Sequence, residues 1–312
     1  MRAVKFAAEG PIVTDYPAPD PKDGVLVRVH ATGICGTDIG IIRLGGIPSV
    51  PGHEISGTMS DATPVTIQPN LPCGSCRMCL TGRSNQCRES MAHFVGLADF
   101  DGGFAEELVV DPSLIRPLPD GMPLDLAALT EPTAVALHAL DRLGTDGEQR
   151  LLIIGGGTIG IIAAAMAVER GLAVTVTARH RHQQNAAESV GAKLSTADSP
   201  GEFTRVLDTA GSQSAMDLAY NLAEPGGRIV SIGGAGWHVA TSLASLVKEL
   251  SVSAAIIYTR PEFEQAIVWL AQWLELADIV ITHRFSLEDA PKAFETAAAR
   301  GDTGAIKVMV LP

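Results

Sequence analysis

The sequence contains the run Leu151-Leu152-Ile153-Ile154-Gly155-Gly156-Gly157-Thr158-Ile159-Gly160, in which four apolar residues lead directly into the pattern Gly-x-Gly-x-x-Gly. An alanine-rich segment with the composition of a helix follows. In such a pattern the first glycine allows a tight turn, the second lets a pyrophosphate approach the backbone, and the third lets the helix lie close to the strand. The helix N-terminus adds free N–H groups and a positive dipole. The run therefore predicts a dinucleotide-binding unit with Gly155, Gly157, Thr158, Ile159 and Gly160 as its contact residues.

Strands and helices continue to alternate after this run. The pattern predicts strands at 173–177, 205–208 and 228–232, helices at 160–170, 183–190 and 216–222, a β-rich run at 250–257, a helix at 261–276, and a final helix and strand within 285–311. Alternation of this kind is typical of a parallel sheet with helical crossovers. The predicted fold class is α/β, with a doubly wound parallel sheet.

The first 130 residues have a different texture. Residues 25–30 alternate in the manner of a strand, and short apolar pieces separated by Pro and Gly follow, which indicates a mostly β region. The chain of 312 residues, 46% of them apolar, is roughly twice the usual length of a ~150-residue domain. We therefore expect two domains, each with its own core.

The charge balance excludes some classes of partner. Lys and Arg number 23 and Asp and Glu number 35, a net charge of −12 with a pI near 5.1, which is the wrong sign for nucleic acid or an anionic membrane. No charged-then-apolar leader occupies residues 1–6. We expect a cytoplasmic protein whose partner is a small molecule.

The end of the second strand in the dinucleotide-binding unit indicates which cofactor binds. Units that bind NAD place Asp or Glu there to accept hydrogen bonds from the ribose hydroxyls. Here Ala178 takes that place, and Arg179, His180, Arg181 and His182 follow. Such a cationic cluster can hold a 2′-phosphate. The sequence thus favours NADP(H) over NAD(H), with Arg179, His180 and Arg181 as ligands; the alternative is that these are solvated charges at a helix start.

Four of the five cysteines follow the spacing Cys73-x2-Cys76-x2-Cys79-x7-Cys87. An odd cysteine count in a large chain favours metal thiolates over disulfides. Four thiolates form a closed tetrahedral zinc site without an open position for substrate, which predicts a structural zinc; a redox or disulfide pair is the alternative. The surrounding segment 68–90 is rich in Pro, Gly, Asn and Cys and is predicted to be an irregular lobe.

The fifth cysteine belongs to a second group of metal-binding residue types. Cys35 lies in Gly33-Ile34-Cys35-Gly36-Thr37-Asp38, Gly52-His53-Glu54 follows, and Glu131 is an acid within the apolar stretch 126–140. Cysteine, histidine and carboxylate form a mixed set that can leave one coordination position of zinc open.

These pieces together resemble the zinc-containing medium-chain alcohol dehydrogenases, especially the threonine, butanediol and polyol dehydrogenases of bacteria. The resemblance covers nearly the whole chain and implies a GroES-like, mostly β catalytic domain at 1–132 with the structural zinc lobe at 68–90, a Rossmann NADP-binding domain at 133–256, and a C-terminal segment at 257–312 that returns to the catalytic domain. The matching pieces are 33–38, 52–54, the four-cysteine lobe, 102–106, 131–132, 155–160, 281–285 and 304–307.

The resemblance also implies roles for individual residues. Cys35 and His53 would be ligands of a catalytic zinc, and Glu54 and Glu131 would bind that zinc directly or through its water. Asp38 would orient His53 and fix its tautomer.

Thr37 would begin a proton relay from the substrate oxygen. Each chain would hold two zinc ions, one catalytic and one structural, and transfer hydride between NADP(H) and a small or medium secondary alcohol or polyol, or its carbonyl. A homodimer or homotetramer joined near 250–257 is implied as well.

Two other functions stay open at this point. One is a catalytically retired module that binds NADPH, and the other is an NADPH-dependent reductase of C=C or C=N bonds with the same fold. His93 lies near the region that lines the substrate cleft in the family, so a polar contact or relay role is open for it.

The chain departs from the family between His53 and Cys73. The segment 57–67 is shorter than expected and predicts a more open site. A second departure is Ala178, which argues against the NAD preference that is common among the threonine and polyol enzymes.

Overall fold

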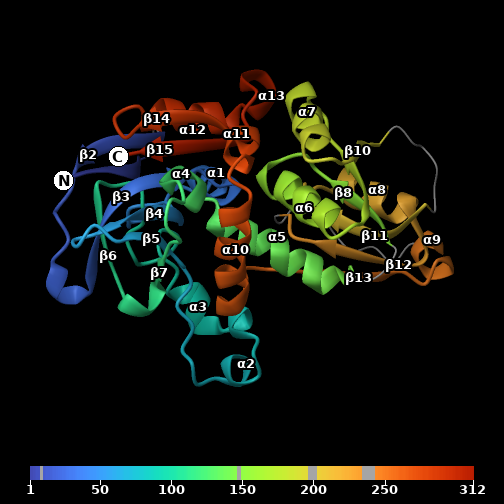
Figure 1. Cartoon of the computed structure of the whole chain (residues 1–312), viewed down its shortest axis with the longest axis horizontal. Coiled ribbons are helices and arrows are strands. Elements are labelled where there is room, and N and C mark those ends of the chain that lie inside the picture. The colour runs from blue at the N-terminus through green and yellow to red at the C-terminus, as the bar shows by residue number, and fades with distance from the viewer. Residues whose placement is uncertain (8–9, 146–148, 196–201, 234–242) are drawn as a thin grey trace. The chain divides into compact units, whose positions relative to one another are not determined.

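The computed structural model describes residues 1–312 except 8–9, 146–148, 196–201 and 234–242 (Figure 1). The chain forms two compact units. Unit 1 combines Met1–Ala134 with Tyr258–Pro312, and unit 2 is Val135–Ile257. The carboxy-terminal segment therefore belongs to the same unit as the amino terminus.

Unit 2 contains a six-stranded parallel sheet with the strand order β10-β9-β8-β11-β12-β13. This is the doubly wound order in which the first strand lies at the centre and the chain proceeds outward in both directions. The predicted α/β fold class is confirmed. The strands are β8 (Arg150–Ile154), β9 (Ala173–Thr177), β10 (Lys193–Leu194), β11 (Phe203–Asp208), β12 (Ala223–Ser231) and β13 (Ser251–Ala254).

Helices connect these strands, as the crossovers of a parallel sheet require. Helix α6 is apolar on all sides and almost wholly buried, and Leu152, Val206, Met216 and Ile229 belong to a core between β-strands and α8. The helices are α5 (Thr130–Leu143), which begins in unit 1, α6 (Thr158–Glu169), α7 (Arg181–Ser189), α8 (Gln213–Leu222) and α9 (Leu243–Val247).

Unit 1 contains a seven-stranded mixed sheet with β3 at its centre. β3 pairs antiparallel with β4, β6 and the last strand of the chain, β15, through Gly33 opposite Met309. The strands of this sheet are β3 (Val25–Gly33), β4 (Glu54–Met59), β5 (Pro64–Ile67), β6 (Glu107–Val110), β7 (Ile115–Pro117), β14 (Ile281–Ser286) and β15 (Lys307–Leu311). A separate antiparallel pair is formed by β1 (Arg2–Ala7) and β2 (Gly10–Asp15).

Two clusters form the core of unit 1. In one, Phe294 makes edge-on contacts with Phe6 and Phe104 at centroid distances of 5.4 and 5.2 Å. In the other, Val27 and Ile55 pack with neighbouring strand residues. The helices are α1 (Gly36–Arg43), α2 (Arg77–Leu80), α3 (Arg88–Ala92), α4 (Leu124–Ala127), α10 (Arg260–Gln272), α11 (Leu276–Val280), α12 (Ala290–Ala298) and α13 (Arg300–Thr303), with 3₁₀ turns at Pro21–Asp23, Ser84–Gln86 and Pro112–Leu114.

The shortened segment at 57–67 forms a hairpin between β4 and β5. Its turn closes through hydrogen bonds from Ala62 N to Met59 O and from Met59 N to Thr63 O, and Ala62 adopts φ +67°. The short segment thus closes in a tight turn, and the pairing of β4 with β5 is intact.

The helix predicted at 261–276 begins as expected but ends earlier, at Gln272. The backbone leaves α10 at Trp273, with φ −124° and ψ 57°, and α11 then buries Leu276 and Ala277. Residues 281–286, for which no strand was predicted, form β14. Within the described residues no helix combines the length and the hydropathy needed to cross a bilayer.

Candidate active site

The pairing of β3 with β4 brings the candidate zinc ligands together. Gly33 at the end of β3 lies opposite Glu54 at the start of β4, so the residues that follow one and precede the other are adjacent. Ligand atoms of Cys35, His53 and Glu54 all lie within 4.8 Å of one another. Gly33 is required for this approach, because a Cβ atom there would lie 2.0 Å from Glu54 Oε2.

Asp38 links the cysteine to the histidine. Its side chain is fully buried at the start of α1, and Oδ2 accepts a hydrogen bond from Cys35 N at 2.8 Å. Oδ1 lies 3.6 Å from His53 Nδ1, and neither atom has a closer hydrogen-bond partner among the described residues. Thr37 Oγ1 lies 3.6 Å from Cys35 Sγ.

The surroundings of His53 favour positive charge. Burial alone lowers the pKa of the imidazole, but the Asp38 carboxylate and then Cys35 raise it well above the ordinary 6.5. A buried imidazole beside a carboxylate and a thiol lies in a place suited to a metal cation, which would take the position of the ring proton.

The two candidate carboxylates have different partners. Both oxygens of Glu54 contact Lys307 Nζ, at 2.6 and 2.5 Å, and these side chains are 1% and 2% exposed. Glu131, in the first turn of α5, is also buried, and burial raises its pKa to about 7, with His53 opposing the rise. Glu54 is therefore neutralised by a lysine, whereas Glu131 has no such ion pair among the described contacts.

The residues present fit a zinc ion with one open position. Thiolate, imidazole and carboxylate are the ligand types of catalytic zinc, and a carboxylate beside the ligand histidine is its usual outer partner. The structure thus brings Cys35, His53, Glu54, Thr37 and Asp38 together in unit 1.

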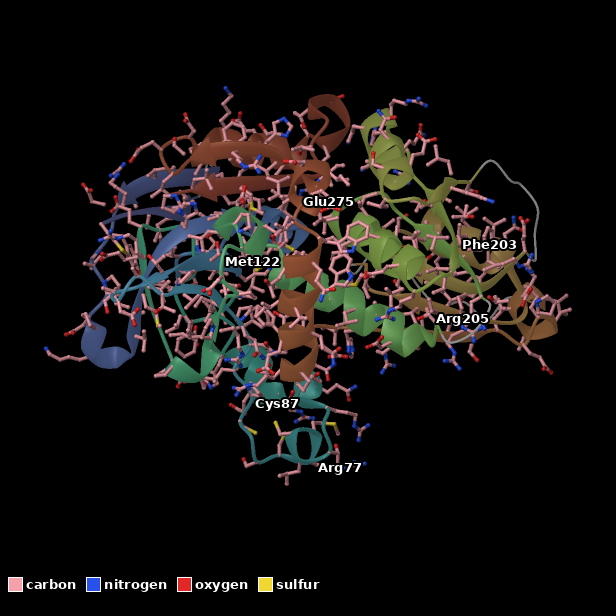
Figure 2. The ribbon with its side chains drawn as sticks, in the orientation of Figure 1. Arg77, Cys87, Met122, Phe203, Arg205 and Glu275 are labelled. Carbon is pink, nitrogen blue, oxygen red and sulfur yellow. The ribbon has the colours of Figure 1, made fainter. Side chains whose placement is uncertain are left out.

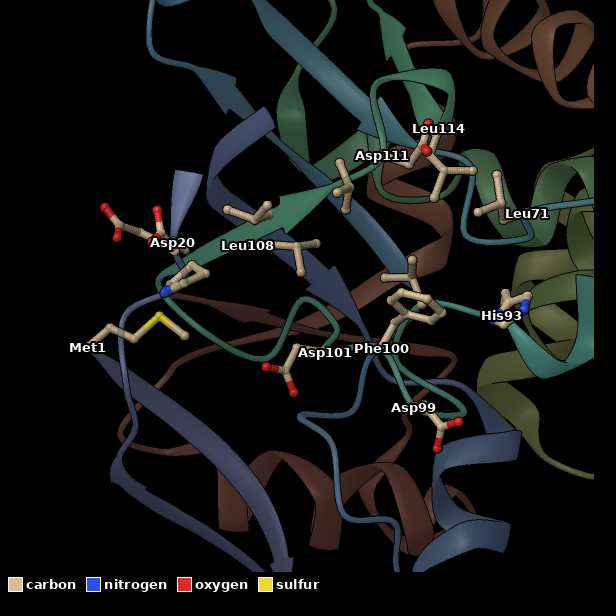
Figure 3. A pocket seen from close by; sticks show the side chains of 15 residues that line it. Met1, Asp20, Leu71, His93, Asp99, Phe100, Asp101, Leu108, Asp111 and Leu114 are labelled. Atoms are coloured by element: carbon tan, nitrogen blue, oxygen red, sulfur yellow. The ribbon is translucent and has the colours of Figure 1, made fainter. Parts of the chain in front are cut away.

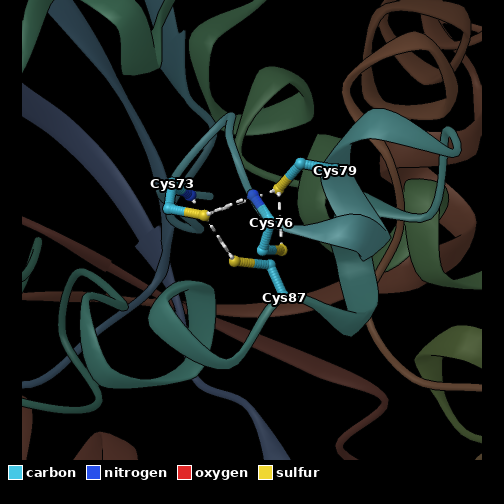
Figure 4. Close-up of side chains that lie close together, drawn as sticks. All are labelled: Cys73, Cys76, Cys79 and Cys87. Atoms are coloured by element: carbon cyan, nitrogen blue, oxygen red, sulfur yellow. Dashed lines mark hydrogen bonds between the residues drawn. The ribbon is translucent and has the colours of Figure 1, made fainter.

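The four-cysteine lobe projects from unit 1 and carries Arg77 and Cys87, both labelled in Figure 2. Its sulfur atoms face one another (Figure 4): the distances are 3.6 Å for Cys73 to Cys87, 3.6 Å for Cys76 to Cys79 and 4.0 Å for Cys73 to Cys79. All four thiols are free of disulfides. A regular tetrahedron with Zn–S bonds of about 2.3 Å has sulfur atoms about 3.8 Å apart.

Backbone N–H groups in the lobe are directed at sulfur. Cys76 N donates to Cys73 Sγ, and the N–H groups of Ser75 and Cys76 lower the pKa of the Cys73 thiol to about 6. Thiolate is the form that binds metal. The geometry and the donors of the lobe therefore fit a closed zinc site.

The glycine turn lies at the carboxyl end of β8. This strand has β9 on one side and β11 on the other, so the turn lies where the strand order reverses, the usual ligand position in such sheets. Gly155 has φ +115°. Gly157 is the N-cap of α6, and a Cβ at Gly160 would lie 2.0 Å from Gly155 O. The tight turn and the close approach of α6 thus follow the glycine pattern of the sequence.

Strand β9 ends at Thr177, so Ala178 occupies the position directly after it. Arg179 and Arg181 are exposed, and α7 begins at Arg181 with His180 as its N-cap. The rings of His180 and His182 stack at 5.5 Å. The cationic cluster therefore surrounds the start of a helix. It lies beside the position at which NAD-binding units have the Asp or Glu that binds the ribose hydroxyls.

His93 lines a different part of unit 1. Its ring contacts Phe100 edge-on at 5.5 Å, its Nε2 lies 3.5 Å from Glu89, and it borders a hollow of about 510 Å³ (Figure 3). No candidate zinc ligand is among the described residues that line this hollow. The structure does not bring His93 to the candidate zinc ligands.

Three residues at the site have no role in the sequence interpretation. Phe94 contacts His53 edge-on at 6.0 Å, Lys307 pairs with Glu54, and the Tyr258 hydroxyl is buried beside Glu131. The Gly304–Lys307 piece of the resemblance contained Lys307, but nothing in the sequence indicated its partner.

Comparison with known proteins places the chain. The family model described as "Alcohol dehydrogenase GroES-like domain" matches residues 21–120, and the one described as "Zinc-binding dehydrogenase" matches residues 158–272. L-galactonate-5-dehydrogenase of Escherichia coli K12 is 30% identical over 306 residues, which cover 89% of either chain. Sorbitol dehydrogenase of Homo sapiens is 28% identical over 317 residues, with 90% of this chain and 88% of the relative covered.

A solved structure extends the likeness to three dimensions. A protein described as a zinc-binding dehydrogenase from Sinorhizobium meliloti 1021, bound to NADP, matches with a TM-score of 0.87 and 29% identity, over 100% of this chain and 99% of that chain. The chain therefore belongs to the zinc-containing medium-chain alcohol dehydrogenase family, and it is an oxidoreductase.

Proposed function

We propose that this protein transfers hydride between NADP(H) and a secondary hydroxyl group of a small or medium polyol, or the corresponding carbonyl, at a zinc ion. The observation that carries the proposal is the set of Cys35, His53 and Glu54, whose ligand atoms lie within 4.8 Å of one another. The substrate class is supported by relatives named as sorbitol and L-galactonate dehydrogenases.

Glu54 and Glu131 have different surroundings, which suggests different roles at the metal. Lys307 holds both oxygens of Glu54, whereas Glu131 forms no such ion pair among the described residues. We assign Cys35, His53 and one carboxylate to the metal, with Glu131 as the acid free to bind zinc or its water. A second zinc in the four-cysteine lobe would be structural.

When bound, zinc supplies Lewis acidity to the substrate oxygen, and NADP(H) supplies or accepts hydride at the carbon that bears it. The residues of the chain do the remaining work. Asp38 fixes the orientation of His53. Thr37, which is exposed, would take up the proton of the substrate hydroxyl and release its own hydroxyl proton to water. Phe94, which is 3% exposed, keeps water from one side of His53.

The preference for NADP(H) is supported by Ala178 and by the exposed Arg179 and Arg181 around the start of α7. An alanine cannot accept hydrogen bonds from ribose hydroxyls, whereas guanidinium groups bind a phosphate through charge-assisted hydrogen bonds.

Cofactor titration tests this preference. We expect the wild type to bind NADP more tightly than NAD, and Arg179→Ala to weaken NADP binding about tenfold to a hundredfold while NAD binding is unchanged. Arg142→Ala, at an exposed arginine of α5 in the same unit, is the matched control. Equal affinities in the wild type, unmoved by Arg179→Ala, would overturn the NADP preference.

Activity tests the metal centre and separates the alternative functions. The zinc-loaded protein should reduce NADP with a panel of polyols, and Cys35→Ala should abolish this while its four-cysteine lobe keeps zinc. A C=C or C=N reductase would retain its activity in Cys35→Ala, and a retired module would show no turnover with any alcohol or carbonyl of the panel.

We also propose a homo-oligomer in which the sheets of two copies of unit 2 meet along β13. This strand lies at the end of the described strand order, and Val247 and Ile256 near it are 73% and 55% exposed. Apolar side chains beside a free sheet edge favour pairing with a second copy.

A further inference from the structure

Tyr258 has a buried hydroxyl group next to the Glu131 carboxylate. The side chain is fully buried, and its ring packs against Phe263 with centroids 5.3 Å apart. Its Oη makes no hydrogen bond of good geometry with a described residue, and the Glu131 carboxylate is the side chain that interacts with it as a hydrogen-bond partner. Because a buried hydroxyl without a well-aligned partner is costly, such a group calls for a functional explanation.

The groups that surround this hydroxyl are the acids of the candidate zinc site. Among these acids, Glu131 acts on the hydroxyl most strongly, ahead of Glu54 and Cys35. A tyrosine hydroxyl can donate its proton to such acceptors. Glu54 already has both oxygens on Lys307, so Glu131 is the carboxylate in need of a donor.

A buried chain of polar side chains holds Tyr258 in place. Asn70 Nδ2 donates to Tyr258 O at 3.4 Å, Gln68 Nε2 donates to Asn70 Oδ1 at 3.1 Å, and Arg116 Nη2 donates to Gln68 Oε1 at 2.6 Å. These three side chains are between 0 and 8% exposed. Arg116 Nε lies 3.4 Å from the Glu264 carboxylate on α10. The backbone of Tyr258 is thus anchored from the end of β5.

The neighbours of Tyr258 in the chain are fixed as well. Thr259 begins α10 with a capping box, in which Glu262 Oε2 accepts from Thr259 N at 2.6 Å and from its hydroxyl at 2.7 Å. On the other side, Ile257 adopts φ +55°, a conformation that a β-branched residue rarely takes. Strain of this kind persists only where the surrounding structure imposes it.

We propose that Tyr258 is a positioning residue for Glu131: its hydroxyl donates a hydrogen bond to the Glu131 carboxylate and holds that carboxylate toward the Cys35 and His53 metal set. Outer partners of this type orient metal ligands and contribute to metal affinity. The inference rests on the proposed function, because it takes Cys35 and His53 as ligands.

Metal binding to Tyr258→Phe tests the proposal without turnover. The variant keeps the aromatic ring and loses only the hydroxyl, so it should fold, and a thermal melt without metal verifies this. We expect its affinity for zinc at the Cys35 set, measured by competition with a chelator, to fall about tenfold or more, while the four-cysteine lobe binds as before. The visible spectrum of Co2+ at the Cys35 set should change too. Tyr220→Phe, at a mostly buried tyrosine of unit 2, is the matched control.

A double variant identifies Glu131 as the group through which Tyr258 acts. Tyr258→Phe combined with Glu131→Ala should bind zinc no more weakly than Glu131→Ala alone, because alanine leaves no acceptor for the hydroxyl. Wild-type affinity in Tyr258→Phe, or additive losses in the double variant, would overturn this inference and leave the proposed function standing. A wild type that binds metal only in its cysteine lobe would overturn both.

Discussion

Lys307 and Glu54 form an ion pair inside unit 1, and both side chains are almost fully buried, which is rare for ion pairs. Lys307 Nζ contacts both carboxylate oxygens and also donates to Ile34 O at 3.1 Å. Two buried charges are tolerated only when each has such partners. The lysine therefore fixes Glu54 beside His53 and cancels one negative charge of the site.

We expect Lys307→Met to lower the free energy of unfolding by about 3 to 5 kcal/mol, because Glu54 would be left buried and unpaired. Urea denaturation measures this change. The double variant with Glu54→Gln should recover most of the lost stability, since it removes the stranded charge. Equal losses in the single and double variants would show that packing, and not charge, is responsible.

Glu131 should make stability depend on pH in the metal-free protein. Burial raises its pKa from 4.5 to about 7, so between these values the folded state keeps a proton that the unfolded state has released. Stability therefore falls as the pH rises from about 4.5 through about 7, and the full loss is present above the folded pKa.

Glu131→Gln should remove this dependence. Near pH 4 the metal-free variant should match the wild type, and at pH 8 it should be more stable by up to about 3 kcal/mol. Thermal melts with a chelator from pH 4 to 8 provide the measurement, and Glu295→Gln, on the exposed face of α12, is the control. A difference from the wild type that is constant across this range would contradict the prediction.

At the scale of elements, the four-cysteine lobe has almost no core of its own. Helix α2 (Arg77–Leu80) has no buried residue, Leu80 is 75% exposed, and of the four cysteines only Cys87 is buried. A single helical turn is not stable alone in water. The lobe therefore depends on whatever joins its sulfur atoms.

Loss of one lobe ligand should unfold this element alone. In zinc-loaded Cys87→Ser we expect the amide protons of residues 73–92 to exchange faster by at least about tenfold, while those of β3 keep their protection. Hydrogen exchange followed by mass spectrometry measures both. Unchanged protection of the lobe would mean that metal does not hold it.

At the scale of the whole molecule, assembly through β13 predicts sensitivity to charge at that strand. Ser251→Lys, at an exposed position of β13, should raise the dissociation constant of the oligomer at least about tenfold, because it places like charges on a sheet edge. Light scattering after size exclusion measures the mass. Ser214→Lys, at an exposed serine of α8, is the control, and an oligomer that Ser251→Lys leaves intact would place the interface elsewhere.

Much of the architecture follows from short stretches of sequence. The run at 151–160 and the alternation after it predicted the parallel sheet, and the cysteine spacing predicted a compact group of sulfur atoms. These features depend on turns, periodicity and spacing within a few residues, which the local sequence controls. The end of α10 was less predictable, because the apolar pattern continues past Gln272 into α11.

The composition of the candidate active site depends on pairings between distant parts of the chain. The antiparallel contact of β15 with β3 brings Lys307 to Glu54 across 253 residues, and the return of the chain at Tyr258 sets its hydroxyl beside Glu131. A lysine and a tyrosine carry no motif, and their roles come from burial beside acids that only the folded chain provides. Local spacing thus defined the elements and the types of candidate ligand, while long-range strand pairing determined which charges meet at the candidate active site.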